Sequence, residues 1–330
     1  MKKILFICPS FFKYELEIYK ELSLNYEVEY WDERPKNSII FKVLLRLKFR
    51  PLIKKAINQY YINLLNNING KHFDYVFVIN PEALDYNTMN KLKQKCLGVN
   101  KQCYFVLYLW DSLKNKPNAP KLFPLFDKVS TFDRKDSDDF NINLIPLFYT
   151  RKFDAKYYPV QPLKYDVCFI GTAHSNRLKY LDEILKIISN NKQISKYIFL
   201  FFPSRMLFLI KKLFCNSSTK HKINFESLPS AKVVDAILSS AVVIDIHHPS
   251  QHGLTMRTIE AVGLNKKIIT TNADIKKYDF YDPKDVYVYQ SGDSKLPDVF
   301  LSTSTTNFKN REMYSLKCWV ENNLKKIISY

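Results

Sequence analysis

The segment at residues 250–272, SQHGLTMRTIEAVGLNKKIITTN, holds two of the six glycines and a charged pair inside one short helical pattern. An apolar run at 241–246 predicts a strand before it, and the run at 267–271 predicts another strand after it. Between the two strands the chain turns at Gly253 and continues as a helical pattern to Ala261. Such a loop directs backbone N–H groups and the helix dipole, about half a positive charge, at its occupant. The pattern therefore predicts a phosphate-binding turn.

Arg257 and Glu260 stand three residues apart and share one face of the expected helix. In the first helical turn, the guanidinium of Arg257 would face a phosphate, while the carboxylate of Glu260 would accept hydrogen bonds from ribose hydroxyls. The spacing equally allows an ordinary ion pair within one helix, which contributes only roughly 0.2–0.5 kcal/mol. Both interpretations remain open from the spacing alone.

Two further positions in this half of the chain are candidates for phosphate binding. Gly171 and Thr172 end the predicted strand that begins at Asp166, and loops at the carboxyl ends of parallel strands line ligand sites in doubly wound folds. Arg177 follows and would add a second cation. A plain tight turn at Gly171 and a solvated helix start at Arg177 are the alternatives.

Three imidazoles, those of His247, His248 and His252, stand on one loop. No carboxylate stands at the helical spacing that would complete a known zinc pattern, so we expect no metal ion here. We expect His252 to donate a hydrogen bond to a diphosphate or a sugar hydroxyl. The alternative is that these histidines are polar loop residues.

Two carboxylates follow apolar strands in the first half of the chain. Asp111 stands two positions after the run at 103–109, and Glu82 follows the run at 74–79. Because the carboxyl ends of strands line the ligand site of such sheets, Asp111 is the best candidate for a catalytic or acceptor-binding carboxylate, and Glu82 is the second. For Asp111, the alternative is a helix cap formed together with Ser112.

Composition restricts the class of protein. With 330 residues and 46% hydrophobic content, the chain is long enough for two domains of about 150 residues each. Six cysteines without any C-x-x-C spacing indicate reduced thiols and a cytosolic location. The N-terminus, MKKILFICPSFF, is better explained as a buried first strand than as a signal peptide, and no apolar run reaches the roughly 18–20 residues that span a bilayer.

Strand patterns alternate with helical patterns along the whole chain, which predicts an α/β architecture of parallel sheets. Prolines in the segment 149–164 favour a linker there. We expect a first Rossmann-like domain at 1–155, a second at 156–310, and a terminal helix at 311–330. That helix carries Met313, Leu316, Val320, Leu324 and Ile327 at helical spacing.

The net charge of +18 is concentrated in two stretches, 35–73 and 184–225, each with eight basic and no acidic residues. In the first, 38–50 forms an amphipathic helical pattern that we expect to stop at Pro51. Residues 36–55 and 203–222 would suit an anionic membrane surface, at about 1 kcal/mol per basic residue. Solvated surface is the leading alternative. Nucleic acid is the weakest one, because no nucleic-acid-binding motif accompanies the charge.

Residues 250–272 resemble the donor-site signature of bacterial glycosyltransferases that build lipopolysaccharide or capsule. Four other segments are similar to the same family, in the family's order: YLWDSLKN at 108–115, STFDRKDSDDF at 130–140, IPLFY at 145–149 and DVCFIGTAHSNR at 166–177. Many of these enzymes carry two acidic residues eight positions apart at the donor, and here His252 holds the first of these positions.

The resemblance implies the GT-B fold, in which two Rossmann-like domains face each other across a cleft and a C-terminal helix packs back on the first domain. It implies metal-independent transfer of a sugar from a nucleotide sugar to a growing surface glycan (lipopolysaccharide, O-antigen or capsule) on a lipid carrier, at the cytoplasmic face of the plasma membrane. A nucleotide-sugar epimerase or hydrolase of the same fold, or a basic nucleic-acid-binding protein, is the alternative. The implied catalytic residues are Asp111, Glu82 and Arg257, and the implied donor-binding residues are Gly171, Thr172, Arg177, His252, Gly253, Leu254, Thr255, Arg257 and Glu260.

Overall fold

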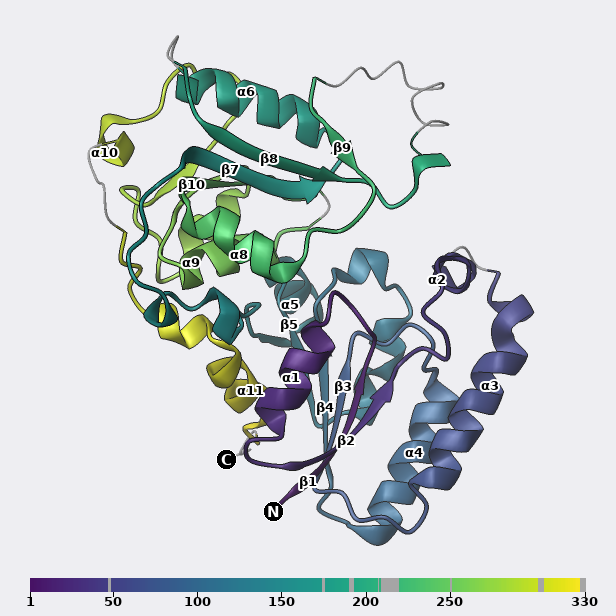
Figure 1. Cartoon of the computed structure of the whole chain (residues 1–330). Helices are drawn as coiled ribbons and strands as arrows, with labels where there is room; N and C mark the ends of the chain where they lie inside the picture. The colour runs from purple at the N-terminus through teal and green to yellow at the C-terminus, as the bar shows by residue number, and fades with distance from the viewer. Residues whose placement is uncertain are drawn as a thin grey trace. The chain divides into compact units, whose positions relative to one another are not determined.

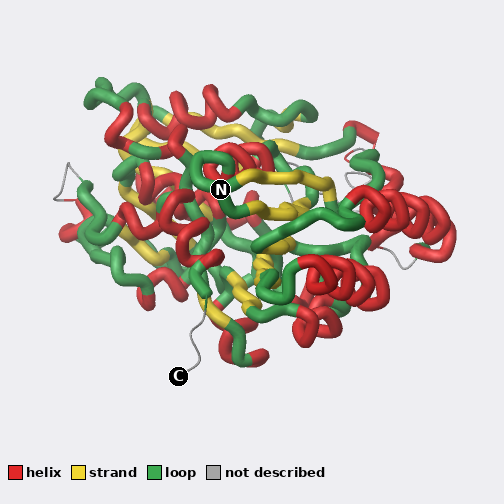
Figure 2. The backbone as a smooth tube through the Cα atoms, turned by 90° about the horizontal axis from the view of Figure 1, so that it is seen from below, coloured by secondary structure: helices red, strands yellow, loops and turns green. Residues whose placement is uncertain are grey.

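The computed structural model describes residues 1–330 except 47–48, 174–175, 190–192, 207, 209–219, 250, 302–305 and 327–330. The chain forms two compact units (Figure 1). The first comprises Met1–Pro146 together with Leu316–Tyr330, and the second comprises Leu147–Ser315. Figure 2 shows strands inside a covering of helices and loops, which is the layered arrangement of an α/β fold.

The first unit contains a parallel sheet in the order β2-β1-β3-β4-β5-β6. Its strands are β1 (Lys3–Cys8), β2 (Glu27–Asp32), β3 (Tyr75–Ile79), β4 (Tyr104–Leu109), β5 (Lys128–Thr131) and β6 (Asn143–Leu144). The central strands are apolar at nearly every position because both of their faces are covered. Their unbroken apolar runs are therefore what a buried parallel sheet requires.

Helices cover both faces of this first sheet. On one face lie α2 (Ile39–Arg46), α3 (Arg50–Asn67) and α4 (Tyr86–Val99), with α3 and α4 side by side in Figure 1. The α3 helix buries Ile53, Ile57, Tyr61 and Leu64 at helical spacing in the core. The unit also contains α5 (Arg134–Phe140) and the 3-10 turns η1 (Leu113–Asn115) and η2 (Ala119–Leu125).

The C-terminal helix α11 (Leu316–Leu324) belongs to the first unit and packs against α1 (Tyr14–Leu22) and β4. Trp319, 2% exposed, anchors it, with its ring centroid 4.8 Å from that of Tyr108 and 5.8 Å from that of Phe77. The expected start of this helix at 311 is wrong. Arg311–Tyr314 is a separate 3-10 turn, η6, and Ser315 is extended, so that Met313 is exposed instead of joining the apolar face.

Proline 51 begins a helix and does not end one. The α2 helix ends at Arg46, and α3 begins at Arg50 with Pro51 in its first turn. A proline costs nothing in the first turn of a helix, because the N–H that it lacks has no acceptor there. The same residue is therefore compatible with a stop or a start, and the local sequence does not decide between them.

The second unit contains another parallel sheet, in the order β12-β11-β10-β7-β8-β9. Its strands are β7 (Tyr165–Thr172), β8 (Lys196–Phe201), β9 (Ile223–Asn224), β10 (Ser240–Asp245), β11 (Lys267–Thr270) and β12 (Val286–Val288). In Figure 1, α6 (Arg177–Ser189) covers one face, and α8 (Ser230–Leu238) and α9 (Met256–Gly263) cover the other. The described part of this unit also contains η3 (Arg151–Phe153), η4 (Ala155–Tyr157), η5 (Ala273–Lys277), α10 (Asp298–Leu301) and η6.

The segment that was expected to be a linker is packed into the second unit. Tyr149 forms a parallel bridge with Ser315, and Tyr149 and Phe153 are buried. The close approach requires Gly263, since a Cβ atom there would lie 2.2 Å from the carbonyl oxygen of Phe153. Arg311 closes the same contact, because its Nη1 atom donates to the Gly263 carbonyl at 2.6 Å.

In each sheet, successive strands are added first on one side of the initial strand and then on its other side, so each sheet has one point where the strand order reverses. In the first sheet it lies between β1 and β3, and in the second it lies between β7 and β10. At such a point the loops after the two neighbouring strands diverge to opposite faces, which leaves a crevice at the carboxyl ends of the strands. Polar side chains gather at both of these points.

Candidate functional site

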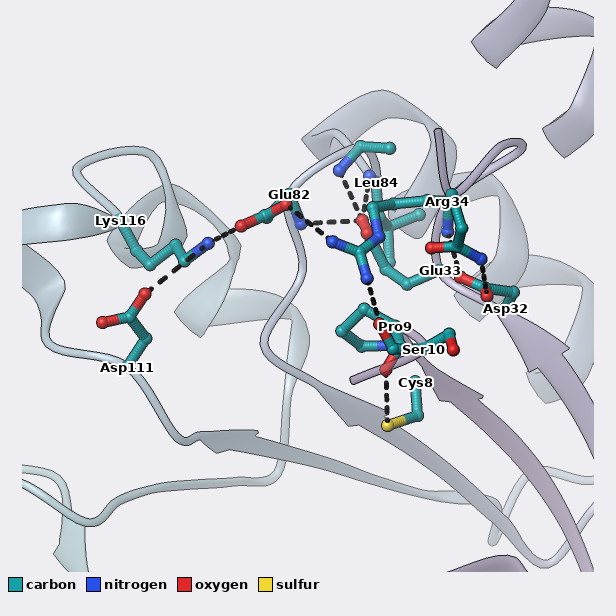
Figure 3. A network of polar contacts seen from close by, with 12 residues as sticks. Cys8, Pro9, Ser10, Asp32, Glu33, Arg34, Glu82, Leu84, Asp111 and Lys116 are labelled. Atoms are coloured by element: carbon teal, nitrogen blue, oxygen red, sulfur yellow. Dashed lines mark hydrogen bonds and ion pairs between the residues drawn. The ribbon is translucent and has the colours of Figure 1, made fainter. Parts of the chain in front are cut away.

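A buried charge network lies at the reversal point of the first sheet (Figure 3). Glu82, whose side chain is only 6% exposed, pairs through one carboxylate oxygen with Lys116 and through the other with Arg34 at 3.4 Å. Arg34 also donates to the carbonyl oxygen of Ser10 at 2.6 Å. The loops after β1, β2, β3 and β4 are thus joined by one set of charges. The cost of burying these charges is offset only if every member keeps its partners.

Glu33 holds the backbone that carries Glu82. Its Oε1 atom accepts hydrogen bonds from the N–H groups of Glu82 at 2.7 Å, Leu84 at 2.8 Å and Ala83 between them. Glu33 is fully buried, and its Oε2 atom has no partner among the described residues. Burial raises the pKa of Glu33 from 4.5 to about 7, although the backbone donors of Leu84 and Ala83 favour the charged form.

The structure connects Asp111 and Glu82, the two predicted catalytic carboxylates, through Lys116. Lys116 Nζ pairs with Glu82 and lies 3.9 Å from Asp111 Oδ2. The side chain of Asp111 is 27% exposed and accepts from Asn115 Nδ2 at 2.9 Å, while Ser112, and not Asp111, caps the next turn. Of the two carboxylates, Asp111 is the more exposed.

Arg177 bridges the reversal point of the second sheet. Its Nη1 atom donates to Thr172 Oγ1 at the end of β7, and its Nε atom donates to the carbonyl oxygen of Ile246, just after β10, at 2.9 Å. Burial lowers the pKa of this guanidinium, with Asp245 acting in the opposite sense. An arginine remains charged under such conditions. A fixed cation therefore stands where a doubly wound sheet binds its ligand.

Residues on both sides of position 250, between β10 and α9, contact residues that follow β11. Asn272, 3% exposed, donates from Nδ2 to the carbonyl oxygens of His252 at 3.1 Å and Gly253 at 3.2 Å. His247 Nδ1 lies 2.7 Å from Thr271 Oγ1, and burial lowers the pKa of His247. These contacts define the backbone path into α9.

The start of α9 is fixed by Asp245 and two threonines. Thr255 is the N-cap residue and accepts from the N–H of Thr258. The carboxylate of Asp245 accepts from Thr255 Oγ1 at 2.9 Å and from Thr258 Oγ1 at 2.8 Å. Leu254, 2% exposed, anchors the loop in the core. The result is a rigid helix N-terminus, which has the geometry of an anion site.

Arg257 and Glu260 form the ion pair that the spacing allowed. Arg257 Nη1 lies 2.6 Å from Glu260 Oε2, and the side chain of Glu260 is only 2% exposed. Arg257 is more accessible, at 20%. Contact of Arg257 with a phosphate and of Glu260 with a ribose stays a prediction.

Gly171 lies inside β7, and not in a turn after it. A Cβ atom there would lie 2.8 Å from the ring of Phe169. Within the described part of the chain, no three His, Cys, Asp or Glu side chains converge as metal ligands.

Sequence reasoning missed several members of both sets: Glu33, Arg34, Lys116, Asp245 and Asn272. Asp245 ends β10, and the other four follow a strand or lie in the loop behind it. Two segments at strand ends carry a local signal for Glu33, Arg34 and Asp245: WDERP at 31–35 and AVVIDI at 241–246. That signal is an acidic or basic residue at a strand end without a local partner. Lys116 and Asn272 lie outside both segments.

No protein-family model matches the chain, and no curated protein sequence matches it at a significant level. Solved structures resemble it in fold. The apo form of WaaB, a lipopolysaccharide outer core galactosyltransferase, is 13% identical, with 97% of this chain and 95% of that one covered and a TM-score of 0.53. An alpha-glucosyltransferase in complex with UDP and a 13-mer DNA is 12% identical, with coverages of 98% and 90% and a TM-score of 0.55. The UDP-GlcNAc 2-epimerase of Methanocaldococcus jannaschii, in complex with UDP-GlcNAc and UDP, is 14% identical, with coverages of 98% and 99% and a TM-score of 0.52.

These likenesses concern the fold, since identities of this size carry no function. Two parallel six-stranded sheets with helices on both faces, and a C-terminal helix packed on the first unit, make this a GT-B fold. The fold class expected from the sequence is confirmed.

Proposed function

We propose that the chain is a glycosyltransferase that moves a sugar from a nucleotide-sugar donor to a growing surface glycan, such as lipopolysaccharide, O-antigen or capsule, on a lipid carrier. One observation carries the proposal. Arg177 bridges the carboxyl ends of β7 and β10, beside a loop that Asn272 fixes and a capped helix N-terminus. This is a preorganised site for the diphosphate of a nucleotide sugar.

Transfer creates negative charge on the departing diphosphate, and the chain itself supplies cations to stabilise it. Arg177 is held by two strand ends and needs no rearrangement. Arg257, in the first turn of α9, adds a second guanidinium, and Glu260 holds that guanidinium from the buried side. A preorganised donor at a developing oxyanion typically contributes about 3–4 kcal/mol, so we expect Arg257→Ala to reduce turnover by about a hundredfold or more. We expect Glu260→Gln to weaken nucleotide binding.

The first unit provides the acceptor side in this proposal. Asp111 is the more exposed carboxylate, and Lys116 ties it to the buried Glu82. In this proposal Asp111 accepts a proton from an acceptor hydroxyl or orients that hydroxyl, while Glu82 positions Lys116. An Asp111→Asn variant would lose proton acceptance and keep the shape of the side chain.

A lipid-linked acceptor would bring the enzyme to the inner face of the plasma membrane. Large apolar side chains are exposed on α2, on the following loop and at the start of α3, next to the exposed Lys54 and Lys55: Ile40, Val43, Phe49 and Leu52. Apolar and cationic groups on one surface suit an anionic bilayer. Among the described residues, no helix is long and apolar enough to cross a membrane. The second basic stretch, 203–222, lies largely outside the described residues.

The membrane contact has a direct test. We expect the double variant Ile40→Ser and Leu52→Ser to bind vesicles containing anionic lipid more weakly than the wild type. Leu24→Ser, at a site of similar exposure elsewhere in the first unit, is the matched control. Equal vesicle binding by all three proteins would reject this surface.

The transfer itself is tested by donor consumption. With a candidate nucleotide sugar alone, turnover should be slow, and a glycolipid acceptor should accelerate the release of nucleoside diphosphate. Fast conversion of the donor without any acceptor would favour a nucleotide-sugar epimerase or hydrolase, the second candidate, because that chemistry occurs on the same fold. Binding to nucleic acid that falls steeply with salt, without any response to nucleotides, would reject both candidates.

A further inference from the structure

A cavity of about 250 Å³ opens at the carboxyl ends of β3 and β4 in the first unit. One wall is the loop after β3 and the first turn of α4, and the other wall is the start of η2. Leu84, Ala119 and Leu122 are buried and form an apolar floor. Glu82 of the buried charge network also lines the cavity.

Four polar or aromatic side chains on the two walls of this cavity have no side-chain partner among the described residues. Tyr86, Asn87, Asn118 and Lys121 are exposed, and their side chains make no hydrogen bond, ion pair or ring contact within the part of the chain that the structure describes. By contrast, the other exposed tyrosine of equal accessibility, Tyr157, has Arg151 over its ring at 4.5 Å. The cavity therefore presents groups that nothing in the fold of the unit requires.

The chemistry of these groups specifies the occupant. Two amides offer paired donors and acceptors on opposite walls, which matches the hydroxyl groups of a sugar, since each hydroxyl both donates and accepts. The ring of Tyr86, 46% exposed, offers an apolar face for the C–H face of a pyranose.

Charge and size argue against other occupants. The Glu82 carboxylate is neutralised by Lys116 and Arg34, and Asp85 accepts from the N–H of Thr88 as the cap of α4, so that neither carboxylate is left to bind a cation. An anion would have one flexible ammonium, that of Lys121, as its charged partner among the described lining residues. The volume also lies below the roughly 300–1,000 Å³ of sites for larger ligands.

We infer that this cavity is a subsite for one neutral pyranose unit of the acceptor glycan, held between Tyr86 and Asn87 on one wall and Asn118 on the other. This inference rests on the proposed function, because it assigns the acceptor side of the same reaction. It places the acceptor sugar next to Glu82, which is one ion pair away from Lys116 and two ion pairs away from Asp111.

The test is saturation-transfer NMR on the full chain with the methyl glycosides of glucose, galactose and N-acetylglucosamine, without any nucleotide. We expect at least one of these to bind at concentrations up to about 50 mM, and we expect Tyr86→Ala and Asn118→Ala each to weaken it about tenfold, the equivalent of 1.4 kcal/mol. Tyr157→Ala is the matched control and should bind as the wild type does. Melting temperatures of the variants verify that they are folded.

The inference is overturned if none of the glycosides binds, if both variants bind like the wild type, or if a uronic acid or sugar phosphate binds in preference. If the protein binds a glycoside but no nucleotide, the proposed function is rejected and the subsite is retained. Acceptor-dependent transfer with an unchanged KM for the acceptor in Tyr86→Ala would support the proposed function and reject the subsite.

Discussion

Replacing Glu33 by glutamine should change how the stability of the first unit depends on pH. Glu33 is fully buried, one of its oxygens accepts three backbone N–H groups, and burial raises its pKa from 4.5 to about 7. The folded protein therefore holds a proton between pH 4.5 and 7 that the unfolded chain releases. The contribution of Glu33 to the free energy of unfolding is therefore fully present below pH 4.5 and is lost as the pH rises from 4.5 through 7.

The size of the effect follows from the two pKa values. The difference between 4.5 and about 7 corresponds to about 3 kcal/mol in total, of which roughly 2.5 kcal/mol is lost between pH 5 and pH 8. In Glu33→Gln the amide oxygen can still accept the N–H groups, and nothing titrates at this position. The free energy of unfolding of the variant, relative to the wild type, should therefore rise by about 2–3 kcal/mol from pH 5 to pH 8.

Urea unfolding followed by tryptophan fluorescence measures this difference. All three tryptophans, Trp31, Trp110 and Trp319, lie in the first unit, so the signal reports on that unit. Groups other than Glu33 titrate in both proteins and cancel. Glu321→Gln is the control for removing one exposed carboxyl. A constant difference between Glu33→Gln and the wild type across this pH range would refute the reasoning.

Three other predictions concern packing and the two polar sites. Gly263→Ala should lower the melting temperature by the equivalent of about 1–3 kcal/mol, whereas Gly98→Ala, with open space around it, should not; equal effects would be contradictory. Lys116→Met should lower the free energy of unfolding in urea by about 3 kcal/mol, because Lys116 is buried. Asp111→Asn should lower it by less than about 1 kcal/mol, because Asp111 is partly exposed. A larger loss in Asp111→Asn than in Lys116→Met would count against the assigned exposures. Asn272→Ala should release the loop before α9 and weaken nucleotide binding in calorimetric titration, and unchanged affinity would show that the loop is not part of the site.

The sequence predicts those helices and strands whose apolar spacing and cap residues lie within the element itself. The β10, α9 and β11 unit could be predicted because two buried strands are continuous apolar runs and Thr255 is a good cap residue. The terminal helix was placed too early, because Met313 continues the apolar spacing while Ser315 interrupts the backbone. Apolar spacing carries no information about such an interruption.

The candidate sites depend on contacts that are distant in the sequence. Arg34 meets Glu82 across 48 positions, and Arg177 meets the carbonyl of Ile246 across 69. Asp111 and Glu82 were predicted as strand-end carboxylates, but Lys116, which joins them, lies in a loop whose path is not encoded locally. The positions of strand ends could be predicted, while the partners of each charge follow only from the strand order.

Nucleotide binding by the wild type and Arg177→Ala tests the central claim most directly. Thermal melting is measured with UDP, GDP, CMP and dTDP, each at saturating concentration. We predict that at least one nucleotide raises the melting temperature of the wild type by roughly 5–10 °C, since a ligand at 100 times its Kd adds about 2.7 kcal/mol, and that Arg177→Ala loses most of this rise. No shift with any nucleotide, or the same shift in Arg177→Ala, would contradict the account.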